Sequence, residues 1–156
     1  MAPQYKVLTG GAVALSAATA KTVLGVKAHA NSGLLLQKLR YGFDGIATGK
    51  VPVLIEVCYC TWATNAPGTN STSVTPVQVN GRVLTVGFTA GKTWTTEPTV
   101  LTVLDEILVR PDAGWPDWMQ YPLGDEYDCA LAEGFALRFT APDAVNVRAN
   151  LRVARC

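Results

Sequence analysis

The chain has 156 residues, of which 49% are hydrophobic and only 16% are charged. This length suits a single domain with a real core. Because the charged share is below the roughly 25% of an average globular protein, much of the surface must be uncharged or covered by other subunits. The 13 Lys and Arg residues are dispersed along the chain against 12 Asp and Glu residues, which argues against a nucleic-acid partner, since such proteins concentrate positive charge.

The N-terminal segment predicts an arm followed by strands. Residues 1–11 end in Gly10-Gly11, where the backbone is free to bend, so Gln4 to Thr9 is expected as a short strand or an arm. The small apolar run at 12–20 resembles a signal-peptide core only superficially and is too short to span a bilayer. It continues into a strand expected at 22–28. We expect an arm at 1–11, one domain at 12–156 and no membrane partner.

Two long strands are expected in the first half. In the run 34–44, alternation places Lys38 and Arg40 outside, with Gln37 as the one polar residue on the inner face. The inner apolar residues are expected to be Leu35, Leu39, Tyr41 and Phe43. The run 51–62 is apolar on both faces, with Val53, Ile55, Val57 and Tyr59 on one and Leu54, Cys58, Cys60 and Trp62 on the other. Such a strand lies between two layers or at a subunit contact.

The second half repeats the β pattern. An exposed loop is expected at 63–75, followed by strands at 74–79, 82–88, 93–96 and 99–109. Residues 110–124 are expected to form a structured loop in which Trp115, Trp118 and Tyr121 are candidate contact residues. The last strands, 135–140 and 145–153, are expected to form a hairpin through 141–144. In 145–153 every odd position is apolar and every even one polar. The pattern predicts an all-β, antiparallel β-sandwich, with the jelly roll as the commonest plan at this size.

The four cysteines favour free thiols over a metal site. Cys58 and Cys60 lie two residues apart on one strand face, whereas Cys129 and Cys156 are remote in sequence. A zinc site would need Cys58, Cys60 and Cys129 with His29 or Cys156 as a fourth ligand, without the paired spacing of a finger or ribbon. A bridge from Cys58 or Cys60 to Cys129 requires neighbouring strands. We expect no cofactor.

No grouping of residues predicts catalysis. Asp105 and Glu106 are adjacent on a strand, so their side chains point to opposite faces and cannot act as an acid–base pair. The carboxylates at 125, 126 and 128 do not match an EF-hand loop, and solvated loop carboxylates are the favoured interpretation. His29 has no accompanying nucleophile signature. We expect a protein that is not an enzyme.

Several segments of the chain carry a resemblance to known proteins. They are ATAKTVL (18–24) with VKA (26–28), YGFDG (41–45) with PVLIE (52–56), and QYPLG (120–124) with TAPDAVNVRA (140–149). Together they resemble a family of small β-proteins of tailed phages that infect actinobacteria. The likeness covers residues 12 to 153 and is a likeness of pattern. It implies a head decoration (cement) protein with a jelly-roll fold that assembles as a homotrimer on the outer capsid surface. The implied partner is the major capsid protein, and the implied location is the virion, after synthesis in the bacterial cytoplasm.

Two contacts are expected on this interpretation. The trimer contact is expected on the face of Leu54, Cys58, Cys60 and Trp62. The arm is expected to add a strand to a capsid edge, with Gln4, Tyr5, Lys6, Val7 and Leu8 as the capsid-contacting residues. The alternatives are a receptor- or carbohydrate-binding β-sandwich module of a phage tail or fibre, using the aromatic loop, and a small hydrolase with a pocket that joins His29 to a carboxylate. The capsid axis, the state of the thiols, metal or glycan binding and the solvent-facing loops do not follow from the sequence.

Overall fold

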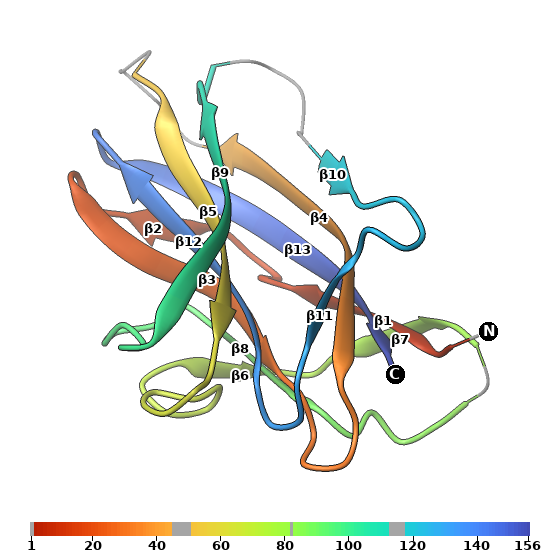
Figure 1. Ribbon diagram of the computed structural model, residues 1–156. Helices are drawn as coiled ribbons and strands as arrows, with labels where there is room; N and C mark the ends of the chain where they lie inside the picture. Colours follow the sequence, from red (N-terminus) through yellow and green to blue (C-terminus); the bar gives the residue numbers. More distant parts are fainter. Residues whose placement is uncertain (1, 45–50, 82, 113–117) are drawn as a thin grey trace.

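The protein is a sandwich of two antiparallel sheets (Figure 1). A computed structural model describes residues 2–44, 51–81, 83–112 and 118–156. Their regular structure is all β-strand, as the period-two alternation of apolar and polar residues predicts. The all-β, antiparallel sandwich is therefore confirmed. The described residues contain no helix of the length and hydropathy needed to cross a bilayer.

The strand order of both sheets is that of a jelly roll. Sheet A runs β10-β4-β13-β1-β7, with β11 also beside β4 and β2 beside β13. Its strands are β1 (Gln4–Leu8), β2 (Val13–Leu15), β4 (Leu34–Asp44), β7 (Val77–Asn80), β10 (Trp118–Gln120), β11 (Tyr127–Cys129) and β13 (Val145–Arg155). Sheet B runs β6-β8-β3-β12-β5-β9. Its strands are β3 (Thr19–Lys27), β5 (Val53–Cys60), β6 (Thr72–Val74), β8 (Thr89–Lys92), β9 (Leu101–Val109) and β12 (Gly134–Ala141). The long strands give the jelly-roll orders β1-β13-β4-β10 and β3-β12-β5-β9, and the first and last strands are neighbours.

The last two strands do not form the expected hairpin. β12 pairs with β3 and β5 in sheet B, whereas β13 pairs with β1 and β4 in sheet A. Residues 142–144 therefore cross between the sheets. Proline and aspartate favour a turn of either kind, so local turn chemistry did not distinguish a hairpin from a crossing.

The N-terminal segment is an integral strand, which is one of the two alternatives that the sequence left open. β1 pairs with β13 on one side and with β7 on the other. Tyr5 and Val7 are fully buried in the core between the sheets. The domain therefore begins before residue 12. Because residues 4–6 already pair with β7 and all of β1 pairs with β13, most of this segment is not available to add a strand to another protein's sheet.

A bulge at Gln37 shifts the inner face of β4. Arg152 of β13 pairs with Lys38, but the next residue, Val153, pairs with Leu36. The extra residue reverses which side chains point inward. Consequently Leu34 and Leu36 are fully buried in the core, and Leu35, predicted to point inward, is on the opposite face and only half-buried.

Two predicted strands, 82–88 and 93–96, are not strands where the structure describes them. Residues 83–88 are irregular, and Gly87 and Thr93 have φ values of 68° and 53°, which an extended strand does not accommodate. The strand lies between them, as β8. The short strands β10 and β11 were not predicted, because three residues are too few to show an alternation.

A second hydrophobic cluster explains why β5 is apolar on both faces. On the outer face of sheet B, the indoles of Trp62 and Trp94 stack with centroids 5.6 Å apart and an interplanar angle of 21°. They pack with Cys58, Cys60 and Ala136. Trp62 Nε1 donates to Val26 O at 3.0 Å, so its polar atom is also satisfied. The strand lies between two dry layers that belong to the same chain.

This cluster removes most of the predicted trimer contact. Cys58, Cys60 and Trp62 are 0%, 1% and 4% exposed within the single chain, so they offer almost no surface to a partner. Only Leu54 remains half-buried on that face. It pairs with Leu108 of β9, which is 69% exposed. The apolar surface left on this side of the sandwich is therefore at the β5–β9 edge.

Candidate functional site

The outer face of sheet A carries a row of three cationic side chains. The register pairs Lys6 of β1 with Arg152 of β13, and Arg152 with Lys38 of β4. Their sequence neighbours Tyr5 and Val153 are buried in the core, so alternation turns these three side chains outward. Adjacent strands lie about 4.8 Å apart, and the row therefore spans about 10 Å across the middle of the sheet.

An uncharged residue of an edge strand lies at each end of the row. Val77 of β7 pairs with Lys6 at one end, and Gln120 of β10 pairs with Lys38 at the other. Two further cationic residues, Arg40 and Arg148, are exposed on the same face. The whole chain has a net charge of only +1, so the charge of the protein is unevenly distributed.

Among the described residues, Asp44 and Glu126 bring negative charge to this face. Asp44 Oδ2 accepts a hydrogen bond from Arg148 Nε at 2.6 Å, which neutralises the far end of β13. Glu126 lines a hollow with Lys38 and Arg152 at the β10 end. The cationic row lies between them.

The aligned cations are unfavourable for the isolated domain. Like charges directly opposite on adjacent strands destabilise a sheet. Arg152 donates through Nη2 to Gln4 Oε1, but its Nε is buried and lacks a hydrogen-bond partner among the described residues. An anionic partner would offset the repulsion between the cations, so this arrangement is suited to binding negative charge.

Two shallow hollows flank the row. One, of about 260 Å³, is the hollow that contains Glu126; Gln4, Gln120 and Tyr121 also line it. The other, of about 440 Å³, lies further along β1, β4 and β13, and its lining includes Leu8, Gly10, Gly42 and Phe43. Its glycines leave room at the surface. The first hollow is mainly polar, and the second offers an apolar floor between Arg40 and Arg148.

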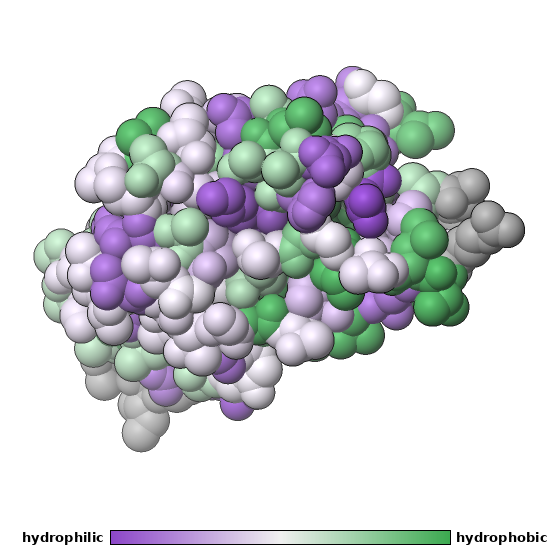
Figure 2. Space-filling view, turned by 90° about the horizontal axis from the view of Figure 1, so that it is seen from below, coloured by the Kyte–Doolittle hydropathy of each residue, from purple (hydrophilic) through white to green (hydrophobic). Residues whose placement is uncertain are grey.

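An exposed apolar residue borders the row on the β7 side. Val77, which pairs with Lys6, is 53% exposed. Val83, three residues after the end of β7, is 91% exposed. Figure 2 shows hydrophobic groups gathered toward the side on which the N-terminus lies in Figure 1. The outer face of sheet A thus combines a cationic centre with an exposed apolar residue, Val77, at its β7 margin.

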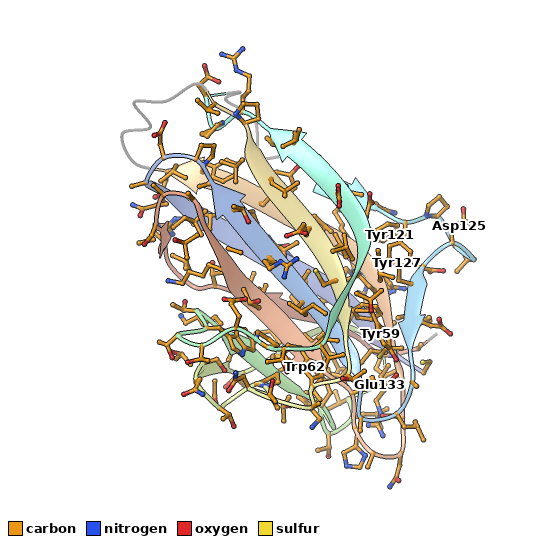
Figure 3. All side chains as sticks on the ribbon, turned by 60° about the vertical axis from the view of Figure 1, so that its left-hand side comes forward. Tyr59, Trp62, Tyr121, Asp125, Tyr127 and Glu133 are labelled. Carbon is orange, nitrogen blue, oxygen red and sulfur yellow. The ribbon has the colours of Figure 1, made fainter. Side chains whose placement is uncertain are left out.

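The predicted aromatic loop is only partly described. Trp115 lies outside the described residues, and Trp118 is in β10, although its side chain is likewise outside them. Tyr121 packs on Tyr127 with ring centroids 4.8 Å apart, and both rings pack against the main core (Figure 3). Burial, followed by the charge of Asp105, raises the pKa of Tyr121. Tyr121 is thus a half-buried packing residue, and its ring is not free to stack on a sugar from both sides.

The candidate catalytic and metal-binding residues remain dispersed. His29 is exposed, and its Nδ1 accepts a hydrogen bond from the backbone of Asn31 at 3.2 Å. The groove beside it, about 630 Å³, is lined largely by alanine, proline and phenylalanine with Lys27, and no carboxylate is among its described lining residues. Within the described ranges, no three His, Cys, Asp or Glu side chains are grouped to hold a metal ion.

All four cysteines are free thiols in this structure. Cys58 and Cys60 are in sheet B and Cys129 is in sheet A, so the strands are not the neighbours that a bridge would need. Burial raises the pKa of Cys58 to about 12 and that of Cys129 to about 11. Thiols held protonated in this way are poor nucleophiles and poor metal ligands. Cys156 alone among the four is exposed.

Sequence reasoning missed the cationic row because its members are far apart in the chain. Position 6, position 38 and position 152 come together only through the jelly-roll order, which places β1 and β4 on either side of β13. Alternation alone showed that Lys38 and Arg152 point outward from their own strands. It gave no information on which strands are neighbours.

No family model, curated protein or solved structure matches this chain.

Proposed function

We propose that this protein is a structural component of a bacteriophage virion, a decoration (cement) protein that binds the outer surface of the capsid shell. The observation that carries the proposal is the cationic row of Lys6, Arg152 and Lys38 on an open sheet face. A binding face of this kind adds contact area across junctions between shell subunits. The jelly roll supports the proposal by analogy, since viral structural proteins use this fold among others.

The contact with the shell is assigned to the outer face of sheet A in place of an N-terminal tether. This face is built on rigid strands, so little backbone ordering is needed when a flat partner docks, and the cost is limited to its long cationic side chains. Opposed charges steer the encounter and set the orientation of the complex. The partner surface is accordingly an acidic one on the major capsid protein.

The homotrimer is part of the same proposal. Its contact is assigned to the β5–β9 edge, where Leu54 and Leu108 leave an apolar surface on sheet B. This edge lies on the opposite sheet from the cationic row, so three copies can associate without covering the face that meets the shell. Cyclic closure of three copies would match a threefold position on an icosahedral shell.

The test is co-sedimentation with purified phage heads that lack the protein. We expect saturable binding that weakens between 50 and 300 mM salt and is lost in a Lys6→Glu, Arg152→Glu variant. The matched control is Lys27→Glu, Arg110→Glu, which makes the same charge change away from the row. Light scattering should give a trimer that dissociates on Leu108→Glu. Equal binding by both charge variants would contradict the assigned face, and failure of the wild-type protein to bind any heads would contradict the function.

A further inference from the structure

We infer that the occupant of the cationic row is an acidic amphipathic helix of the partner, lying across the strands of sheet A. The inference rests on the proposed function and names the kind of partner segment that the same face accepts. It follows from the direction of the row, the spacing of its charges and the apolar hollow beside it.

The direction of the row comes from the register. Across the strands, Lys6, Arg152 and Lys38 are immediate neighbours with no other residue between them. Along β13, the cationic residues Arg152 and Arg148 are separated by Asn150. The closest spacing of cationic residues therefore runs perpendicular to the strands.

The spacing of the row favours a helix over an extended segment. Three cationic residues on adjacent strands span about 10 Å. Carboxylates at positions i, i+4 and i+7 of a helix lie on one face and span about 10.5 Å. Three carboxylates on one face of an extended segment, at i, i+2 and i+4, span about 13.5 Å. The helix matches the row more closely.

The surroundings of the row suit the apolar side of such a helix. The next outward row, one step of about 7 Å along the strands, contains Leu8, Asn150 and Arg40. It borders the 440 Å³ hollow with Phe43 in its lining. A helix about 10 Å in diameter with its acidic stripe over the row would place a neighbouring stripe over Leu8 and this hollow. Apolar residues on this neighbouring stripe of the helix would pack against Leu8 and the hollow.

The ends of the row set the length of the helix. Exposed Val77 lies at one end, and Gln120 with Glu126 lies at the other. Glu126 would repel a further carboxylate, so the acidic stripe of the helix ends at Lys38. At the other end, the helix continues toward Val77 with apolar residues. About three turns of helix cover this distance.

Fluorescence anisotropy of the full-length protein with two labelled synthetic peptides tests the inference. Both peptides have 15 residues and the same composition. One carries glutamates at i, i+4 and i+7 with leucines on the adjacent stripe, and the other carries the glutamates at i, i+2 and i+4. We expect the helical-spacing peptide to bind at least 10-fold more tightly at 50 mM salt. Arg152→Gln should weaken its binding several-fold, Arg110→Gln should leave it unchanged, and Glu126→Gln should strengthen it about twofold.

The outcomes separate this inference from the proposed function. Equal affinity for the two peptides, or equally tight binding of a single-stranded oligonucleotide of matching charge, would overturn the helix. Binding of heads without binding of the helical peptide would also overturn it while leaving the decoration function intact. Binding of the helical peptide without binding of heads would support the helix site and contradict the decoration function.

Discussion

The indole of Trp62 lies directly over Gly25. A β-carbon on this glycine would come within 2.7 Å of Trp62 Cη2 and 2.9 Å of Trp94 Cη2. Gly25 belongs to β3 and pairs with Ala136 on one side and Gly91 on the other. The small residues form a platform on sheet B, and the two indoles cover it.

Adding a methyl group to this platform should destabilise the protein. Gly25→Ala forces the rings of Trp62 and Trp94 out of their positions, which we expect to lower the free energy of unfolding by about 1–3 kcal/mol. Urea denaturation followed by tryptophan fluorescence measures the change. Gly11→Ala is the control, because nothing lies within 4 Å of a β-carbon there. A Gly25→Ala variant as stable as Gly11→Ala would show that the rings adjust without cost.

The ion pair between Arg138 and Glu56 should be sensitive to loss of one partner. Arg138 Nε and Nη2 donate to the two carboxylate oxygens of Glu56 at 2.7 and 2.9 Å, and the Glu56 side chain is only 9% exposed. Arg138→Met leaves a buried carboxylate without its partner and should cost about 2–3 kcal/mol. Adding Glu56→Met should recover most of that loss. A double variant no more stable than Arg138→Met would contradict this account.

The sequence predicts best the long strands, in which apolar and polar residues alternate over many positions. β4 and β13 were found nearly residue by residue, since 11 residues show the period clearly. Alternation does not show to which sheet a strand belongs, so the sequence predicts a hairpin where the structure has a crossing from β12 to β13. Bulges such as Gln37 insert a residue without any change of composition, and they reversed the predicted face of Leu35.

The candidate site was less accessible to sequence for the same reason. Lys6, Lys38 and Arg152 look like ordinary outward residues of three separate strands. Only the order β4-β13-β1 brings them into one row. The second hydrophobic cluster, which covers the outer face of β5, could not be predicted either. Trp62 and Trp94 are 32 residues apart and meet only when the loops after β5 and β8 fold over sheet B.

Stability should fall at alkaline pH through the buried thiols. Burial raises the pKa of Cys58 from 9.0 to about 12 in the folded chain, whereas the unfolded chain titrates near 9. This contribution is therefore complete below pH 9 and is lost as the pH rises toward 12, by up to about 1.4 kcal/mol per pH unit. Urea unfolding with a reductant at pH 8 and 10.5 measures it. Cys58→Ala should be less stable than wild type at pH 8, and the gap should narrow at pH 10.5. A constant gap would contradict the assignment.

Repulsion within the cationic row should lower the free energy of unfolding of the isolated protein. Because Lys6 directly faces Arg152, replacing it with Gln removes a cross-strand repulsion of about 0.2–1 kcal/mol. We expect Lys6→Gln to raise the free energy of unfolding at 20 mM salt, and the gain to shrink at 500 mM salt, where the charges are screened. Lys27→Gln makes the same charge change on β3, opposite Gly134 and Thr89, and should give no such gain. The same Lys6→Gln variant should bind heads more weakly. A variant that lost stability, or one that gained it equally at both salt concentrations, would show that the row carries no electrostatic strain for a partner to relieve.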